Sequence, residues 1–274
     1  MALTTNDGLT AALANARGFA WFKANVTAEA VGRFHSYWFV PGNPGAAIAD
    51  SPGLAGVAIT NAFGSGIIPF TSPGGANTVY LGAFSAVGAT AGQVILYDRL
   101  WHNSGIVGNT TGAQTVNSVA WPARDENGST LGANVGLWLE CQTATTNAGV
   151  VANTTVGYTN SAGVAGRVGN LVPDWPATGV AGTMVPFSLQ AGDVGVRSVQ
   201  SITLGTSYGA GGVVRLVAAR QLCTLPIPIP NVGQSLNFYD AGRVLHPGSA
   251  LALMQLVTAT AQGLIMGDFL QIEG

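Results

Sequence analysis

The stretch Gln93–Ile106, QVILYDRLWHNSGI, decides the fold of this 274-residue chain, because long apolar, aromatic and paired charged side chains meet there. Read as a strand of period two, its side chains alternate, so that Asp98 and Arg99 point to opposite faces. Neither face is cleanly polar, which predicts a strand covered on both sides, by a second sheet or by a neighbouring subunit. Asp98 and Arg99 then need polar partners wherever they are buried.

Outward from this stretch, the chain divides into strand-length apolar runs separated by Gly, Asn, Ser and Thr. Val135–Gln142 alternates most clearly, with Leu137 on an apolar face and Trp138 and Glu140 on the other, as in a half-buried antiparallel strand. Several short strands without interleaved helices predict a mainly β fold, an antiparallel β-sandwich or jelly roll. The predicted strands are Thr78–Phe84, Gln93–Trp101, Val135–Gln142, Val151–Tyr158, Val196–Leu204, Val213–Ala219, Ala250–Thr258 and Leu264–Ile272.

Residues 1–76 are expected to form a short N-terminal helical and extended arm. Apolar residues recur at helical spacing over Leu9–Ala16, and a second short helix is predicted over Thr27–Phe34. The Pro/Gly-rich segment Pro41–Pro52 indicates a loop or an extended arm, and such segments commonly reach onto neighbours in assemblies.

Residues 77–222 contain most of the predicted strands and are expected to form the β-sandwich core domain. After them, the sequence CTLPIPIP at Cys223–Pro230 alternates proline with apolar residues, which forbids a helix and favours a polyproline-II segment. Residues 223–274 are therefore predicted to be a Pro-rich connector followed by a C-terminal β segment.

The composition is unusually poor in charge. Charged residues make up 8% of the chain and the net charge is −2, whereas ordinary soluble domains have roughly 25% charged residues. A free monomer with so few strongly hydrated side chains has difficulty staying dispersed, so we expect much of the surface to be buried in an assembly. The near-neutral balance leaves no basic field for direct contact with nucleic acid.

We also expect no membrane partner. Every apolar run is interrupted too early to cross a bilayer as a helix. Outer-membrane proteins use shorter, alternating strands, but Met1–Thr5 has neither the basic nor the apolar part of an export signal. The sequence therefore predicts a protein made in the cytoplasm of its cell.

Asp98, His102 and Ser104 supply the residue types of a hydrolytic triad within a few positions. Residues four apart in an extended strand are separated by roughly 13 Å, which is too far for the acid to orient the base. The serine also lacks a glycine-flanked nucleophile elbow. The pattern indicates a structural His-Asn-Ser turn, so we expect no enzyme activity and assign no catalytic, cofactor-binding or metal-binding residues.

Two possible metal sites have simpler interpretations. His35, His102 and His246 are far apart in the sequence and lack the paired spacing typical of zinc ligands. Asp125–Gly128 offers adjacent oxygens but not the regular ligand spacing of a calcium loop. A solvated β-turn is the interpretation that these turn-forming residues favour.

A glycine-rich segment and two cysteines complete the candidates. Gly205–Gly212 is followed by neither the lysine nor the helix of a phosphate-binding loop, so it predicts a hairpin loop between the strands on either side. Cys141 and Cys223 lie in strand-like contexts without metal-ligand spacing. We expect both to be buried free thiols.

Four stretches resemble structural proteins from the virions of tailed bacteriophages. They are LYDRLWHNSGI at 96–106, TTGAQTVNSVAWPARDENG at 110–128, TATTNAGVVANTTVGYTNSAGVAGR at 143–167 and VPFSLQAGDVGVRSVQSITLGTSYGAGGVVRLV at 185–217. Together they cover about residues 93–219, and the N-terminal arm and the segment after Cys223 lie outside them. The resemblance implies a virion component without enzyme activity, made in the cytoplasm of an infected bacterium, and it leaves the position in the virion open.

Composition and resemblance together predict a capsid cement or decoration protein on the virion surface. It would bridge subunits of the major capsid protein and form symmetric oligomers, a homotrimer in the simplest case, so that many modest interfaces add up. A tail, neck or head-fibre protein is the alternative; a major capsid protein is disfavoured because no long helix pattern is present. A carbohydrate-binding module is the alternative from another class, and it requires an exposed aromatic residue such as Trp138 or Trp101 beside a pocket with Asp or Asn.

Overall fold

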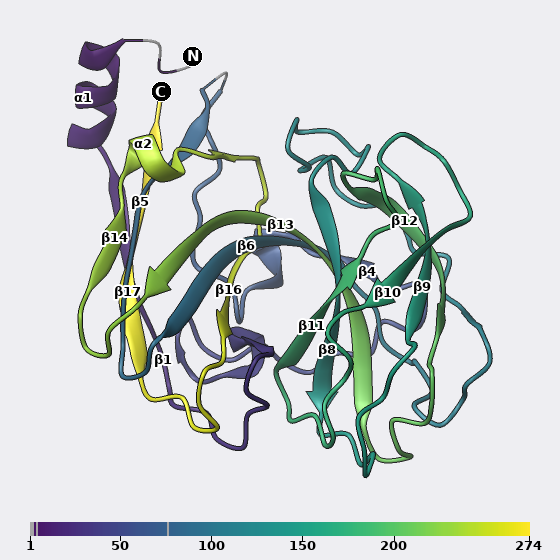
Figure 1. Cartoon of the computed structure of the whole chain (residues 1–274). Helices are drawn as coiled ribbons and strands as arrows, with labels where there is room; N and C mark the ends of the chain where they lie inside the picture. Colours follow the sequence, from purple (N-terminus) through teal and green to yellow (C-terminus); the bar gives the residue numbers. More distant parts are fainter. Residues whose placement is uncertain (1–2, 4, 76) are drawn as a thin grey trace.

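The computed structural model describes residue 3, residues 5–75 and residues 77–274. Its strands form two sheets in which all the described strand pairs are antiparallel. Two long, curved strands, β6 (Gly92–His102) and β13 (Val213–Ile227), run side by side between the two halves of the molecule (Figure 1). The predicted mainly β, antiparallel fold is confirmed, while the finer sandwich or jelly-roll topology stays a prediction.

The first sheet has the strand order β14-β5-β17-β1-β3, with β15 beside β5. Its inner face buries an apolar core in which the rings of Trp21 and Phe84 stack with their centroids 5.7 Å apart. Its strands are β1 (Arg17–Lys23), β3 (Gly42–Asn43), β5 (Val79–Gly88), β14 (Gln234–Leu236), β15 (Val244–Leu245) and β17 (Ile265–Glu273).

The second sheet has the order β2-β16-β6-β13-β8-β11-β10-β9-β12-β7, with β4 beside β6. Because β2 also pairs with β11, the first six of these strands close into a six-strand barrel. Besides β6 and β13, its strands are β2 (Phe34–Ser36), β4 (Val57–Ala58), β7 (Gln114–Thr115), β8 (Val135–Thr143), β9 (Thr155–Asn160), β10 (Arg167–Leu171), β11 (Thr183–Ser188), β12 (Val196–Thr203) and β16 (Leu251–Leu256).

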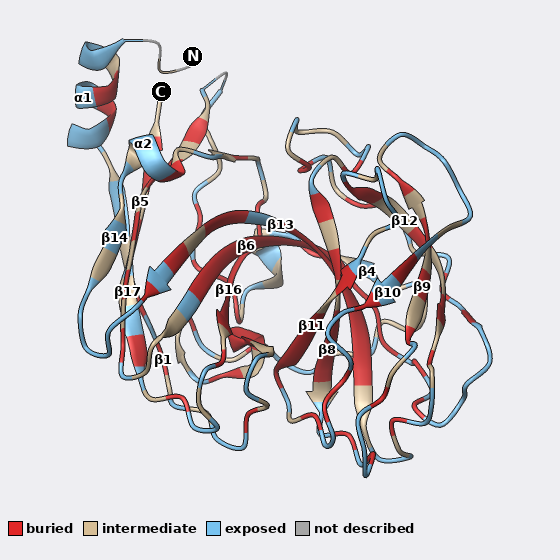
Figure 2. Ribbon diagram, viewed as in Figure 1, coloured by how far each residue is buried: buried red, intermediate tan, exposed pale blue. Residues whose placement is uncertain are grey.

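Apolar cores lie inside the six-strand barrel and on two of its outer sides. One outer core joins the barrel to the first sheet, and the other joins it to β9, β10 and β12. As a result β6 is buried on both faces from Val94 to His102 (Figure 2), as its sequence predicts, and the cover comes from the same chain. Each barrel strand contributes to the interior core, through Phe34, Tyr97, Trp138, Met184, Ala219 and Met254.

The end of β13 corrects the predicted polyproline-II connector. Cys223–Ile227 continue the strand, and Pro226 lies opposite Gln93 of β6. Proline is tolerated there because the ladder with β8 ends at Arg220, so only one side of β13 still requires backbone donors. Register shifts against β6 and β8 mark bulges in this strand, and bulges increase bending and twist, which fits its curved path.

One predicted helix is present and the other is absent. α1 (Asn6–Ala14) begins behind Thr5, whose Oγ1 accepts a hydrogen bond from the Gly8 N–H, and it packs at the end of the first sheet. The predicted helix over Thr27–Phe34 is wrong, because Ala28 has a φ of +62° and the adjoining backbone pairs with residues 260–262 instead. The other helical segments are α2 (Phe238–Ala241) and the 3₁₀ turns η1 (Tyr37–Phe39) and η2 (Asn61–Phe63).

All eight predicted strands are present, as β5, β6, β8, β9, β12, β13, β16 and β17. Among the strands of five or more residues, the sequence pattern missed β1, β10 and β11; β10 carries a glycine and an asparagine, and β11 contains Pro186, all of which weaken a strand signal. The expected boundary between residues 222 and 223 falls inside β13. β1 and β17, from opposite ends of the chain, are neighbours in the first sheet.

The chain is folded back on itself. Its accessible surface is 10,664 Å², close to the roughly 11,000 Å² typical of a monomeric protein of 27.7 kDa. The Pro/Gly-rich segment Pro41–Pro52 lies against its own barrel, where the Ala47 N–H donates to the Trp38 carbonyl. Within the described ranges, no helix has the length and hydropathy needed to cross a bilayer.

Candidate functional site

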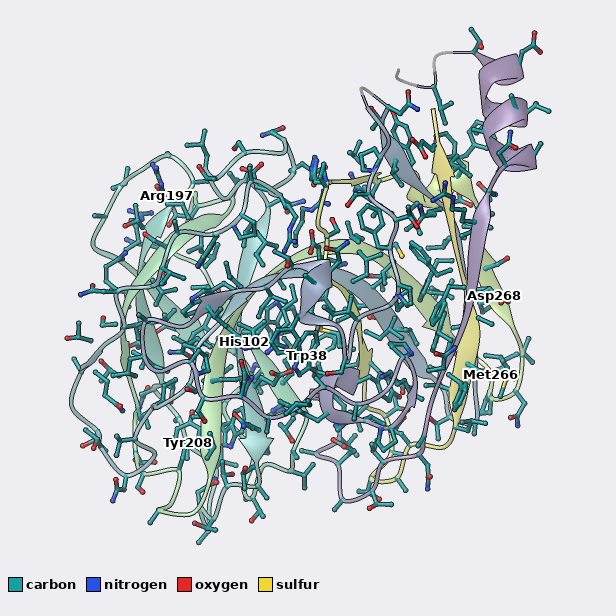
Figure 3. The ribbon with its side chains drawn as sticks, turned by 180° about the vertical axis from the view of Figure 1, so that it is seen from behind. Trp38, His102, Arg197, Tyr208, Met266 and Asp268 are labelled. Carbon is teal, nitrogen blue, oxygen red and sulfur yellow. The ribbon has the colours of Figure 1, made fainter. Side chains whose placement is uncertain are left out.

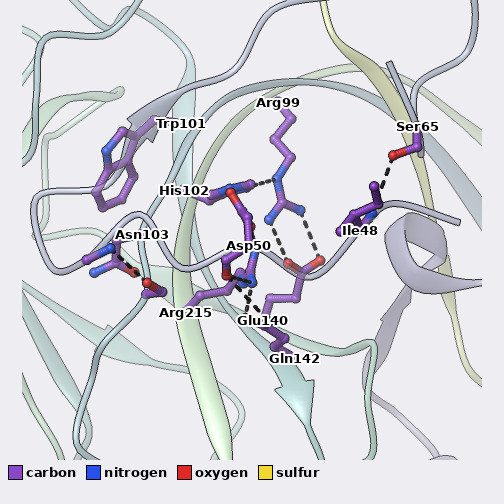
Figure 4. A network of polar contacts seen from close by, with 12 residues as sticks. Ile48, Asp50, Ser65, Arg99, Trp101, His102, Asn103, Glu140, Gln142 and Arg215 are labelled. Atoms are coloured by element: carbon purple, nitrogen blue, oxygen red, sulfur yellow. Dashed lines mark hydrogen bonds and ion pairs between the residues drawn. The ribbon is translucent and has the colours of Figure 1, made fainter. Parts of the chain in front are cut away.

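A buried ion pair lies inside the six-strand barrel. Arg99 of β6 and Glu140 of β8 form a two-pronged contact, with Nη1–Oε1 and Nη2–Oε2 distances of 3.0 and 2.7 Å, and both side chains are fully buried (Figure 4). The guanidinium also lies 4.3 Å from the ring centroid of Trp38. Burial raises the pKa of Glu140, but the charge and hydrogen bonds of Arg99 outweigh it and hold that pKa below the ordinary value.

His102 connects this pair to the Pro/Gly-rich segment. Its Nδ1 accepts a hydrogen bond from Arg99 Nε at 3.0 Å, and its Nε2 lies 2.9 Å from Asp50 Oδ2. Because Arg99 can only donate, Nδ1 carries no proton and Nε2 donates to Asp50. Burial, followed by the nearby charge of Arg99, lowers the pKa of His102 to about 4, so the ring is neutral at pH 7.

Asp50 closes the network at the end of the barrel. Its Oδ1 accepts from Arg215 Nη1 at 3.0 Å, and Arg215 also donates to Gln142 Oε1 (Figure 4). Burial alone raises the pKa of Asp50, but His102 and Arg215 together lower it to about 2. The Pro/Gly-rich segment that carries Asp50 is thereby held on the barrel by charge-assisted hydrogen bonds.

Asp98, the neighbour of Arg99 along β6, faces the other way and has its own partners. Its carboxylate accepts from the Ser249 hydroxyl at 3.0 Å and from the Ala250 N–H at 2.8 Å, and Arg124 Nε lies 3.3 Å away. Arg124 also donates to the carbonyls of Ile59 and Arg99. The expectation that both charges of this strand find partners is therefore confirmed.

These contacts separate the residues of the sequence triad. Asp98 points away from His102, which bonds Asp50 and Arg99, while Ser104 Oγ accepts from the Gly53 N–H at 2.9 Å. The serine hydroxyl has no contact with the imidazole among the described bonds, so the structure does not assemble a nucleophile and its base. The arrangement fixes the strand and its loops.

The three histidines lie in separate places. His35 Nδ1 lies 2.5 Å from the Glu29 carboxylate, His102 belongs to the barrel network, and His246 lies against Gly128. In the part of the chain that the structure describes, no three His, Cys, Asp or Glu side chains are grouped as metal ligands. The expected turn at Asp125 is present, since its carboxylate accepts from the backbone N–H groups of residues 127, 129 and 133. The prediction that this turn is solvated is wrong for Asp125 itself, which is fully buried.

The segment Gly205–Gly212 is not the predicted hairpin loop. β12 pairs with β7 and β9, whereas β13 pairs with β6 and β8, so the strands it joins are not neighbours. The segment is tied inward by Tyr208, which is buried and whose hydroxyl lies 2.8 Å from Thr154 Oγ1. Cys141 and Cys223 are free and buried, as predicted, and burial raises the pKa of each thiol to about 12.

The outer face of the first sheet is open to solvent. Phe22, Met266 and Val87 lie in one cross-strand row, and the first two are 46% and 42% exposed. In the next row, the Ser85 hydroxyl contacts Asp268 at 3.4 Å. A groove of about 500 Å³ follows these rows, on the side away from Trp38 and His102 (Figure 3). Exposed apolar surface of this kind marks sites of interaction.

Because many charged side chains are buried, the surface is even poorer in charge than the composition of the whole chain indicates. Nine of the 22 Asp, Glu, Lys and Arg side chains are buried, which leaves 13 on the whole surface of 10,664 Å². Large apolar side chains are exposed on several loops, among them Ile48, Val194 and Ile229. The surface is therefore weakly hydrated over wide areas.

The sequence did not reveal most members of the barrel network, among them Glu140 and Asp50. Glu140 was placed on the half-exposed face of its strand, because period two alone does not reveal a closed barrel that buries this face as well. Asp50 lies 52 residues from His102 along the chain, in a Pro/Gly-rich segment with no strand or helix pattern around it. A lone acid in such a segment gives no signal of its partner.

Comparisons with known proteins do not assign this chain to a family. No family model matches the chain, and no curated protein matches it. A solved structure of infectious bursal disease virus, Gt strain, is 10% identical over 94% of this chain and 80% of that chain, with a TM-score of 0.20. The capsid asymmetric unit of cyanophage Pam1 is 18% identical over 73% of this chain and 92% of that chain, with a TM-score of 0.13. Likenesses this weak carry no argument about fold or function.

Proposed function

We propose that this chain is a non-enzymatic structural protein of a tailed-phage virion, and more narrowly a capsid cement or decoration protein on the particle surface. Its partners are the major capsid protein, whose subunits it bridges, and copies of itself in a homotrimer. The sequence resemblance over residues 93–219 supports the virion assignment. The weak likenesses to solved viral particles have no part in it.

One observation carries the proposal, namely the charge-poor surface. Thirteen charged side chains on 10,664 Å² give a free monomer little protection against association. Interfaces in permanent assemblies are depleted in charge at their centres and rich in apolar groups, as this surface is. A component that meets neighbours on several sides accounts for such a surface without invoking catalysis.

The same surface suits a tail, neck or head-fibre protein, so position in the particle is the deciding measurement. Electron cryomicroscopy of purified particles reads both the number of copies and their sites. Copies at many equivalent positions between major capsid subunits are the expected result. Copies confined to the tail or the portal vertex would replace the cement assignment, and particles without this chain would refute the virion assignment.

A truncation tests whether the N-terminal helix acts as a clamp. Removing residues 1–14 deletes α1 but leaves β1, which begins at Arg17, in the first sheet. We expect the truncated protein to fold and to decorate particles poorly, since Leu13 on α1 is 42% exposed and faces away from the chain's own core. Replacing exposed Val194 by serine is the control for loss of an apolar side chain elsewhere. Normal decoration by the truncated chain would contradict the clamp.

A further inference from the structure

Trp138 differs from the other five tryptophans of the chain. Those five are buried, whereas Trp138 on β8 is half-buried. Phe34 meets its indole edge-on, with ring centroids 5.2 Å apart at an interplanar angle of 88°. The indole is thus fixed by packing, while its Nε1 has no acceptor among the described bonds and is not enclosed by protein. A rigid aromatic face with a free N–H is preorganised for a ligand.

A pocket of about 150 Å³ lies in front of this indole, at one mouth of the six-strand barrel. Trp138, Tyr97 and Met254 supply its apolar walls, and Asn134 and Gln221 supply polar groups. A cavity of about 150 Å³ accommodates a benzene-sized molecule. The pocket therefore has room for a single six-membered ring.

Small residues keep this space open. Gly136 on β8 lies opposite Ala219 on β13, and both line the pocket. A Cβ added to Gly136 would lie 3.6 Å from Trp138 Nε1, an ordinary van der Waals contact, so a side chain fits the backbone here but would occupy the space beside the indole. The pocket is therefore open because two paired positions, 136 and 219, carry a glycine and an alanine.

The polar groups of the pocket are neutral. Asn134 uses its Nδ2 on Glu126 at 3.2 Å, and Gln221 uses its Nε2 on Thr224 at 2.6 Å. Each amide keeps a carbonyl oxygen as an acceptor, and Trp138 adds one donor. No lining residue is charged. A ligand that suits these groups is uncharged, carries hydroxyl groups, and has one apolar ring face.

We propose that this pocket binds one neutral pyranose unit of a glycan, with the C–H face of the sugar stacked on Trp138. The sugar hydroxyls would donate to the amide oxygens of Asn134 and Gln221. A purely apolar ring is a poorer occupant, because it would strip water from these amides without replacing their hydrogen bonds. The site lies on the barrel and is independent of the assembly role proposed above.

The indole N–H resonances of the full-length ¹⁵N-labelled protein test the proposal. The probes are the methyl glycosides of glucose, galactose, mannose, rhamnose and N-acetylglucosamine, with phenol as the apolar-ring comparison. We expect at least one sugar to shift the Trp138 resonance, assigned with Trp138→Phe, and to saturate it with a Kd on the order of millimolar, as is usual for so small a ligand. The resonances of the five buried tryptophans should not move.

Two variants and one control make the test specific. Gly136→Val should fill the hollow and weaken binding at least tenfold, and Gln221→Ala, at an exposed position, should weaken it severalfold without affecting folding. Gly149→Ala is the control, because a Cβ there meets nothing within 4 Å. The proposal is overturned if no sugar shifts Trp138 at 100 mM, if phenol binds more tightly than every sugar, or if Gly136→Val and Gln221→Ala bind like the control.

Discussion

Replacing Glu140 by glutamine should destabilise the protein severely. Glutamine keeps one acceptor for Arg99 but turns an amide N–H₂ toward the other guanidinium nitrogen, and it leaves a fully buried cation without its anion. Asp50, the other acid of this network, is already bonded to His102 and Arg215. Breaking a buried pair in this way costs about 3–5 kcal/mol of unfolding free energy. For a chain of this size, that loss lowers Tm by roughly 6–20 °C.

Urea unfolding followed by tryptophan fluorescence measures this loss at pH 7. The matched control is Glu126→Gln, which breaks the exposed pair with Arg243 and should change stability by less than about 1 kcal/mol. The double variant Arg99→Met with Glu140→Leu removes both charges and should recover most of the loss. The reasoning is refuted if Glu140→Gln unfolds within about 1 kcal/mol of the wild type, or if the exposed control loses as much.

Three further predictions follow from the same contacts. The pKa of His102 is near 4 in the folded protein and about 6.5 in the unfolded chain, so the free energy of unfolding should fall as pH drops from 6.5 to 4, by up to about 3 kcal/mol. Urea unfolding at several pH values measures this slope. His102→Gln should flatten it, and an unchanged slope would contradict the prediction. Leu137→Asp places an unpaired carboxylate in the core and should abolish folding, as judged by circular dichroism, whereas Thr143→Asp at an exposed position of the same strand should fold. Cys141 and Cys223 should not react with a thiol reagent at pH 8 until urea unfolds the chain, and rapid native reaction of both would show that they are not buried.

Period-two patterns predicted the strands well where one rule decided the outcome. Apolar residues at Val135, Leu137 and Leu139 face a core, and β6 is covered on both faces as its mixed pattern indicates. The same rule failed for Glu140, because a strand in a closed barrel buries its second face too. Closure depends on the pairing of β2 with β11, which joins residues about 150 positions apart, and local sequence carries no trace of it.

Other failures arose where tertiary pairing overrode local preference. Proline at position 226 argues against a strand because it has no backbone N–H. It is tolerated in β13 because this part of the strand pairs only with β6. The helix expected over Thr27–Phe34 gave way to backbone pairing with the segment before β17. We predicted no catalytic triad at Asp98, His102 and Ser104 because residues four apart in an extended strand are too far apart to contact each other. The pocket at Trp138 could not be predicted, since it needs four strands and a loop residue to meet at one mouth of the barrel.

The passage of β6 and β13 through both halves of the molecule has a mechanical consequence. These strands pair with each other along most of their length while each contributes to the cores on both sides. A tensile load that separates the two halves would run along the strands, so the ladder between them would be sheared with many hydrogen bonds loaded together instead of unzipped one at a time. Single-molecule pulling from residues in opposite halves should therefore give a high rupture force, and a low one would mean that another path yields first. A shell component built this way would transmit strain across its body and would not come apart between its sheets.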